Sequence, residues 1–210
     1  MSMSLMVLIT SLYKVATGWL VRAVYGGSLH NVGVRLLYLP SLARMSFLWS
    51  YMGKKNWYDR VDDTVILGAL PFRSQTKELV EREKVTATIS VNEWYEIQFF
   101  TNNKKEWEAH GVTQHWFETV DFQPPSLDNI REGLEVINQV KASGNSVYLH
   151  CKAGKGRSAV VAACYLIKDR NLSVGEAIDF LRSKRPQISI NKFQRQRVTE
   201  FLELSKTKSE

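Results

Sequence analysis

The chain has 210 residues, of which 44% are hydrophobic and 23% are charged. This balance is that of an ordinary globular protein, and it excludes a disordered, collagen-like or polytopic membrane chain. Two Cys and four scattered His provide neither a disulfide scaffold nor a zinc-binding pattern, and they favour a reducing compartment.

The net charge of +7 is concentrated at the N-terminus. Residues 1–58 contain six Lys or Arg and no Asp or Glu, which leaves the rest of the chain nearly neutral. Nucleic-acid binding requires a basic stripe on the folded domain. We therefore expect no nucleic-acid partner.

The acid-free segment has the composition of a targeting sequence. Its two apolar stretches, Leu5–Tyr25 and Val34–Met52, are interrupted by Lys or Arg. Neither is therefore the unbroken run of about 20 apolar residues that spans a bilayer. Spaced cations without acids are typical of a mitochondrial presequence, and cationic amphipathic helices bind anionic membranes. We expect residues 1–52 to be a targeting or membrane-associated segment, the alternative being a helical extension that does not direct import.

From Asn56 onward, β-rich stretches alternate with amphipathic ones. Expected strands are 64–70, 86–91, 114–118 and 146–150. Expected helices are 75–83, 127–143, 158–170, 174–184 and 191–204. This alternation predicts an α/β domain over 53–205, with a mostly parallel sheet and helices on both of its faces, followed by a disordered tail at 206–210.

One loop in this domain carries a sequence motif typical of a catalytic site. Residues 150–158 read HCKAGKGRS and connect a β-rich strand to a helix. The amide groups of a Gly-rich loop and the N-terminus of a helix together bind an anion. The same field stabilises a thiolate, so Cys151 is expected to be an ionised nucleophile.

The rest of the loop fits the binding of a phosphate group. Arg157 is the sixth residue after Cys151, and its planar guanidinium matches two phosphate oxygens. Ser158 is placed to donate a hydrogen bond to the sulfur, and the two glycines permit torsions that larger residues would block. The residues of the loop expected to bind substrate are Lys152, Ala153, Gly154, Lys155, Gly156 and Ser158.

Other interpretations of the loop fit less well. A nucleotide-binding P-loop needs a Gly where Leu149 stands, and the dinucleotide pattern G-x-G-x-x-G is absent from the loop. A structural role for Cys151 as a small buried residue does not explain the three cations and two glycines that follow it.

Phosphoryl transfer also needs a proton donor for the leaving oxygen. Asp121 follows a predicted strand, thirty residues before Cys151, and precedes the pair Pro124-Pro125. We expect Asp121 to be the general acid, the alternative being a turn or cap residue. Protein groups supply the charge stabilisation, so no metal or other cofactor is expected.

These residues resemble those of the cysteine-dependent dual-specificity phosphatases. VILGALP at 65–71, NEWYE at 92–96 and TVD at 119–121 resemble the mitochondrial protein-tyrosine-phosphatase-like branch, whose members act as phosphatidylglycerophosphate phosphatases. Trp94 stands where that branch has an acidic residue. The resemblance implies a cysteine-phosphatase fold with Cys151 as nucleophile, Arg157 in the phosphate cradle, and Asp121 as acid and then base. It further implies that the site is bordered by Glu93, Tyr95, Glu96, Asn191 and Gln194.

The expected reaction is hydrolysis of a phosphomonoester through a cysteinyl-phosphate intermediate. The favoured substrate is phosphatidylglycerophosphate, converted to phosphatidylglycerol in cardiolipin synthesis, because Lys152 and Lys155 match its second phosphate charge. Alternatives are a phosphotyrosine or phosphothreonine protein, a phosphoinositide, and a non-catalytic phospho-binding scaffold. The expected partners are thus an anionic phospholipid and a membrane surface, with phosphoproteins as further candidates. We expect a monomer at the matrix side of the mitochondrial inner membrane.

Overall fold

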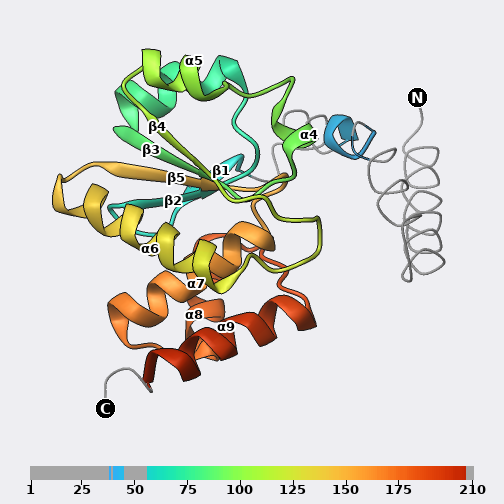
Figure 1. Cartoon of the computed structure of the whole chain (residues 1–210), viewed down its shortest axis with the longest axis vertical. Helices are drawn as coiled ribbons and strands as arrows, with labels where there is room; N and C mark the ends of the chain where they lie inside the picture. Colours follow the sequence, from blue (N-terminus) through green and yellow to red (C-terminus); the bar gives the residue numbers. More distant parts are fainter. Residues whose placement is uncertain (1–37, 39, 45–55, 207–210) are drawn as a thin grey trace. The chain divides into compact units, whose positions relative to one another are not determined.

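The computed structural model describes residues 38, 40–44 and 56–206 (Figure 1). The chain divides into two compact units, Met1–Tyr51 and Met52–Glu210. In the first unit the described residues are helical, and the remainder of the predicted targeting segment lies outside them. No helix in the described part of the chain combines the length and the apolar character needed to cross a membrane.

A five-stranded sheet forms the centre of the second unit, as far as the structure describes it. Its strands are β1 (Tyr58–Arg60), β2 (Val65–Gly68), β3 (Val85–Ser90), β4 (Thr113–Trp116) and β5 (Ser146–His150), in the spatial order β1-β2-β5-β3-β4. The edge strand β1 is antiparallel to β2, whereas the other pairings are parallel. The predicted mostly parallel sheet is confirmed, and β1 is an addition to it.

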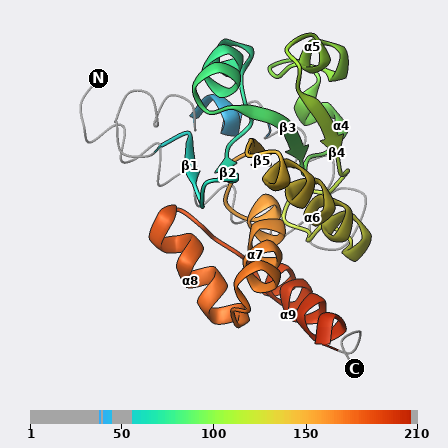
Figure 2. The same ribbon diagram turned by 90° about the vertical axis from the view of Figure 1, so that its left-hand side faces the viewer.

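Helices cover both faces of the sheet, as predicted (Figures 1 and 2). One face carries the long helices α6 (Leu127–Ala142), α7 (Arg157–Arg170), α8 (Val174–Lys184) and α9 (Lys192–Lys206). The other face carries short elements: the π-helical turn η2 (Glu78–Arg82) and α5 (Lys104–Ala109), with the 3₁₀ turn η1 (Arg73–Gln75) and α4 (Trp94–Ile97) in the connections. The helix predicted at 75–83 is confirmed as one helical stretch over 73–82, which begins with 3₁₀ and ends with π-helical geometry. Helix α9 continues through Lys206, and residues 207–210 lie outside the described part.

Side chains of the central strands alternate between the two faces, because successive residues of a strand point to opposite sides. Leu67 and Leu149 pack into the large core formed with α6–α9. Ile66 and Tyr148 pack on the opposite side against Trp107 of α5. Both faces of the central strands are buried, which explains their nearly continuous apolar sequence.

The parallel strands bring three loops to one edge of the sheet. Parallel strands end at the same edge, and ligands bind outside their carboxyl ends. Cys151 follows β5, Glu93 lies shortly after β3, and the segment leading to Asp121 follows β4. These segments, far apart in the sequence, build the candidate active site.

Candidate active site

The loop between β5 and α7 is shaped by a close contact with β2. Gly154 has a φ of +61°, and a Cβ atom there would lie 2.2 Å from the carbonyl oxygen of Gly68. Only glycine satisfies both conditions. The amide of Leu70 donates to the carbonyl of Lys152 (3.2 Å), so the loop is fastened to the end of β2 on this side.

Arg185, at the end of α8, holds the same loop through hydrogen bonds to its backbone carbonyls. Its Nε donates to the carbonyl of Gly154 (2.9 Å) and its Nη2 to the carbonyl of Ala153 (3.2 Å), while Nη1 pairs with Asp59 (2.6 Å). In a trans peptide the C=O and N–H groups point in opposite directions. The Gly154 carbonyl bound to Arg185 therefore turns the amide of Lys155 toward the interior of the loop.

Cys151 lies inside this loop and is almost completely buried. Ser158 Oγ donates to its Sγ (3.3 Å), as expected from the sequence. Burial alone would raise the pKa of Cys151, but the charge of Arg157 and hydrogen bonds from Ser158 and the amide of Lys155 outweigh it, so the pKa is lowered. The field that favours an anion here also favours a thiolate.

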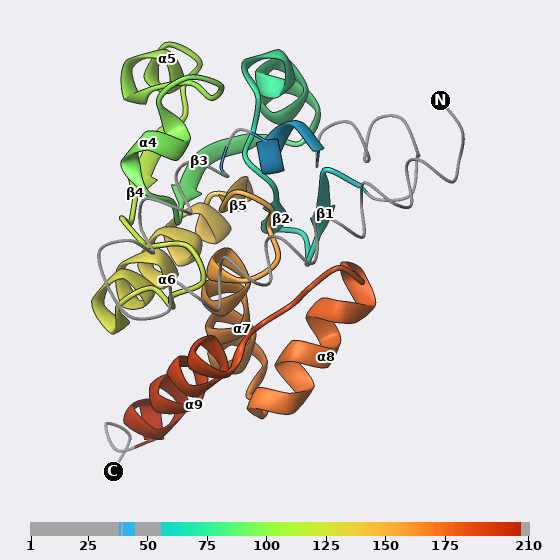
Figure 3. The same ribbon diagram turned by 90° about the vertical axis from the view of Figure 1, so that its right-hand side faces the viewer.

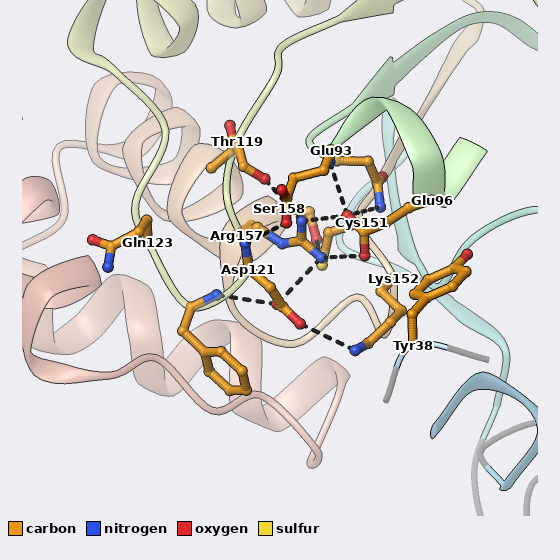
Figure 4. A network of polar contacts seen from close by, with 12 residues as sticks. Tyr38, Glu93, Glu96, Thr119, Asp121, Gln123, Cys151, Lys152, Arg157 and Ser158 are labelled. Carbon is orange, nitrogen blue, oxygen red and sulfur yellow. Dashed lines mark hydrogen bonds and ion pairs between the residues drawn. The ribbon is translucent and has the colours of Figure 1, made fainter. Parts of the chain in front are cut away.

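Arg157, the first residue of α7, is held by a two-point ion pair (Figure 4). Its Nη1 and Nη2 lie 2.6 and 2.9 Å from the two carboxylate oxygens of Glu96, and Nη1 also donates to the carbonyl of Thr119. Its Nε is buried and has no hydrogen-bond partner among the described residues. An unsatisfied buried donor is costly, and a phosphate oxygen would satisfy this one.

Asp121 completes the charged network (Figure 4). Its Oδ1 lies 3.3 Å from Arg157 Nη2 and its Oδ2 lies 3.0 Å from Lys152 Nζ. Burial would raise the pKa of this carboxyl, but the charges of Arg157 and Lys152 outweigh burial and lower it to about 2. Asp121 is therefore a carboxylate, and it binds the same guanidinium that is expected to bind the phosphate.

The Glu93–Glu96 segment supports this network from the end of β3. Glu93 Oε2 accepts from Tyr95 OH (3.2 Å) and from the amide of Asp121 (3.4 Å). Glu96 accepts from the amide of Glu93 (2.8 Å) as well as from Arg157. The structure thus brings both acids to the site through contacts with Asp121 and Arg157, and it places Tyr95 on Glu93.

Gln194 lies behind the loop, buried at the start of α9. A Cβ atom on Gly156 would be 3.0 Å from its side-chain amide, and its Nε2 donates to the carbonyl of Gln123 (3.4 Å). Asn191 Nδ2 donates to the carbonyl of Phe122 (2.7 Å). These two residues therefore connect α9 with the Asp121 segment.

His150 is a buried neutral group below the nucleophile. Its Nε2 lies 2.7 Å from Ser90 Oγ. Burial and, to a smaller degree, the charge of Arg157 lower the pKa of His150 to about 3. A neutral imidazole that bonds the neighbouring strand fits a role in positioning Cys151 and does not fit a base.

The sequence did not point to Arg185 or Thr119. Arg185 is fully buried, yet in the sequence it is one of several cations before Pro186. Thr119 contributes only its backbone carbonyl, to which the residue type gives no clue. The one available signal for Arg185 was its position immediately after an amphipathic helix, which does not distinguish it from a helix C-terminal cation.

Comparison with known proteins agrees with this geometry. The family pattern described as "Dual specificity phosphatase, catalytic domain" matches residues 69–201. The mouse protein "Phosphatidylglycerophosphatase and protein-tyrosine phosphatase 1" is 41% identical over 170 residues, covering 80% of this chain and 88% of the mouse protein. The Arabidopsis thaliana "Phosphatidylglycerophosphate phosphatase PTPMT2" is 31% identical over 184 residues, covering 87% of this chain and 79% of the plant protein.

A solved structure extends the comparison to three dimensions. The crystal structure of PTPMT1 in complex with PI(5)P has a TM-score of 0.72 and 40% sequence identity, and the match covers 74% of this chain and all of that one. The expected family and cysteine-phosphatase fold are thereby confirmed. The chain belongs to the dual-specificity phosphatase family, as a cysteine-dependent phosphatase of its PTPMT1-like phosphatidylglycerophosphatase branch.

Proposed function

We propose that this phosphatase hydrolyses phosphatidylglycerophosphate to phosphatidylglycerol, with Cys151 as nucleophile, Arg157 as phosphate ligand and Asp121 as general acid and base. The observation that carries the proposal is the convergence of three groups: a buried sulfur with a lowered pKa, a buried guanidinium Nε that has no partner within the described part of the chain, and a carboxylate on the same guanidinium. The names of the mouse and Arabidopsis relatives support this choice of substrate.

The first step transfers the phosphoryl group to sulfur. The phosphate takes the open Nε of Arg157 and displaces Asp121 from Nη2, since both anions compete for that nitrogen. Loss of this ion pair and the new negative charge both raise the pKa of Asp121, which then carries a proton. The Cys151 thiolate attacks phosphorus, the S–P bond forms, the P–O bond to glycerol breaks, and Asp121 protonates the leaving oxygen.

The second step releases phosphate. A water molecule attacks phosphorus, the S–P bond breaks, and the Asp121 carboxylate takes the proton of the water. The thiolate that leaves is stabilised by Ser158 and the amide of Lys155, the same groups that lower the pKa of Cys151. Glu96 takes no proton in this scheme and keeps Arg157 in position throughout.

The cations near the site support a lipid substrate that carries more than one negatively charged phosphate. Lys152 and Lys155 add charge beside the cradle, and Lys152 lies 3.0 Å from Asp121. The solved PTPMT1 structure is a complex with PI(5)P, a phosphoinositide. Residues 1–52, basic and free of acids, support a location at the matrix side of the mitochondrial inner membrane.

A second candidate is a protein phosphatase acting on phosphotyrosine or phosphothreonine. The observation that favours it is the name of the mammalian relatives, which joins both activities. The bound phosphoryl group would meet the same Cys151, Arg157 and Asp121. The two candidates differ in substrate and share the chemistry.

One assay distinguishes these candidates. Purified full-length protein is given phosphatidylglycerophosphate, phosphoinositides and phosphotyrosine peptides at equal phosphate concentration, and released phosphate is measured. We expect the highest kcat/KM for phosphatidylglycerophosphate and no turnover by Cys151→Ser. A higher kcat/KM for the peptides would overturn the proposed substrate, and full activity of Cys151→Ser would overturn the covalent route.

A further inference from the structure

Exposed apolar side chains are unevenly distributed over the protein. In the described part of the chain eight large apolar side chains are exposed, and seven of them lie between residues 94 and 122 or in the first turn of α9. The eighth, Leu204, lies at the far end of α9. Single exposed apolar residues are normal, whereas a group of them marks an interaction surface.

Four of these residues lie on segments that build or adjoin the phosphate site, and we call them the aromatic rim: Trp94, Trp116, Phe122 and Phe193. Trp94 and Phe193 are each 50% exposed, Phe122 is 44% exposed and Trp116 is 43% exposed.

The rim belongs to the site because each member sits on a segment that builds it. Trp94 follows Glu93, and Trp116 Nε1 donates to the carbonyl of Asn92 (2.9 Å). Phe122 follows Asp121, and its carbonyl accepts from Asn191, two residues before Phe193. Figures 1 and 3 show α4, the segment 117–126 and the first turn of α9 on one side of the domain.

Charges beside the rim favour an anionic neighbour. Phe193 lies between the exposed cations Lys192 and Arg195, and the first turn of α9 contains no acid. Near the end of β4, the exposed Glu118 lies between Trp116 and Val120 and contributes a negative charge that works against this preference. Tryptophan and phenylalanine next to Lys and Arg are the side chains that settle at the headgroup level of a bilayer.

We propose that the aromatic rim inserts into the interface of an anionic bilayer and seats the phosphate site directly on the headgroups. This inference rests on the proposed function, because a phosphatidylglycerophosphate headgroup stays at that interface while its acyl chains stay in the membrane. The rim gives the enzyme a preference for phosphate presented on a bilayer over the same phosphate in solution.

Substitution of the two most exposed rim residues tests the proposal in the full-length protein. The double variant Trp94→Ser/Phe193→Ser is compared with the wild type and with Leu204→Ser, a matched apolar residue on the same helix as Phe193. Each protein is assayed on three substrates: phosphatidylglycerophosphate in phosphatidylcholine–phosphatidylglycerol vesicles, soluble short-chain phosphatidylglycerophosphate, and a phosphotyrosine peptide. The N-terminal segment is identical in all three proteins, so it cannot cause a difference among them.

We expect kcat/KM on vesicles to fall about tenfold in the double variant and kcat/KM on the soluble lipid to stay within about twofold. Leu204→Ser should match the wild type on both lipids. An unchanged rate on vesicles, or an equal loss on both lipids, would overturn the membrane role of the rim. A loss confined to phosphopeptides would instead assign the rim to a protein partner and would also overturn the proposal.

Tryptophan fluorescence gives an independent measurement. Lipids brominated in their acyl chains quench tryptophans that enter the bilayer, and the quenching lost in Trp94→Phe isolates the contribution of Trp94. We expect Trp94 to be quenched, and unquenched emission would overturn the proposal. Failure of the wild type to hydrolyse even the soluble lipid would instead refute the proposed function, and the quenching would still test the rim.

Discussion

Glu96 holds Arg157 by both carboxylate oxygens, at 2.6 and 2.9 Å, in a pair that is only 1–2% exposed. The guanidinium is thereby fixed with its Nε directed away from Glu96 and without a partner among the described residues. An arginine side chain that is already held in position before the substrate arrives loses little conformational entropy when it binds the phosphate. Glu96 is in this sense a positioning residue for Arg157.

Glu96→Gln is expected to destabilise the protein and to weaken catalysis. The substitution removes the two-point counter-charge of a buried guanidinium and leaves Asp121 as its nearest carboxylate, which costs up to about 3–5 kcal/mol. Chemical denaturation and kcat/KM on an aryl phosphate measure the two effects. The matched control is Glu106→Gln, whose partner Arg73 is about two-fifths exposed, and there the change should stay below about 1 kcal/mol. Equal effects of the two substitutions would contradict the positioning role.

Cys151 is expected to react as a thiolate at lower pH than an ordinary cysteine does. Its lowered pKa predicts that alkylation by iodoacetamide continues at pH values where an ordinary thiol is protonated. Ser158→Ala removes one hydrogen bond to the sulfur and should raise the midpoint of this profile. Cys164 is an internal control, because burial raises its pKa and should keep it unreactive. Alkylation of Cys151 with the midpoint of a free thiol would refute the electrostatic account.

Asp121→Asn is expected to affect poor leaving groups most. An alkoxide needs a proton as it leaves, whereas p-nitrophenolate does not, so the variant should lose about 10²–10⁴ in kcat/KM on an alkyl phosphate and much less on p-nitrophenyl phosphate. The ratio kcat/KM is used because it excludes hydrolysis of the cysteinyl-phosphate, a step that both substrates share. Steady-state rates on the two substrates give the ratio. Asp128→Asn, at an exposed pair with Arg131, should change neither rate. The same loss on both substrates would remove Asp121 from the role of acid.

Arg185 is expected to lower the pKa of Cys151 indirectly, by orienting the backbone of the loop. Without its bond to the Gly154 carbonyl, the amide of Lys155 is no longer turned toward Cys151. Arg185→Met should therefore raise the pH midpoint of Cys151 alkylation and weaken orthovanadate binding, and Arg185→Lys should restore part of both. A purely structural residue would lower stability and leave the alkylation midpoint unchanged, which is the result that would exclude this role.

His150 predicts a loss of stability in mild acid. Its pKa is about 3 in the folded protein and near 6.5 in the unfolded chain, so between these values only the unfolded chain binds the proton. This contribution is complete above pH 6.5 and decreases by about 1.4 kcal/mol per pH unit as the pH falls toward 3. Urea unfolding of His150→Gln should show a flatter pH dependence than the wild type. His115→Gln, at a partly exposed imidazole, should change the slope less.

Much of the fold could be predicted from the sequence, because the long elements carry clear patterns. Ser126 caps α6 and accepts from the amide of Asn129, and Ser173 with Glu176 forms the predicted capping box of α8. The strand and helix around Cys151 lie where the motif placed them. Strand β1 and helix α4 have three and four residues, too few for a periodic pattern to appear. Helix α5 begins with an Asn103–Glu106 capping box, but its six residues are too few for a periodic pattern to accompany this local signal.

Within the active site, the sequence predicted those residues that lie near one another along the chain. The strand–loop–helix arrangement of Cys151 and Arg157 is local, and the structure places both residues accordingly. The contact between Arg157 and Glu96 joins two elements 61 residues apart, and the family resemblance implied only that Glu96 borders the site. Arg185 depends entirely on tertiary packing, since its partners Asp59 and Gly154 lie in distant segments. No local pattern carries that information.

The most direct test of the account is whether a phosphoryl group passes through Cys151. Phosphatidylglycerophosphate labelled in its terminal phosphate is mixed with the protein, quenched in acid within the first turnover and analysed by peptide mass spectrometry. We predict a phosphorylated Cys151 peptide in the wild type and none in Cys151→Ser. In Asp121→Asn the peptide should accumulate with p-nitrophenyl phosphate, whose leaving group needs no acid, because the base for hydrolysis is missing. Turnover with no label on Cys151 at any quench time, in both the wild type and Asp121→Asn, would contradict the central claim.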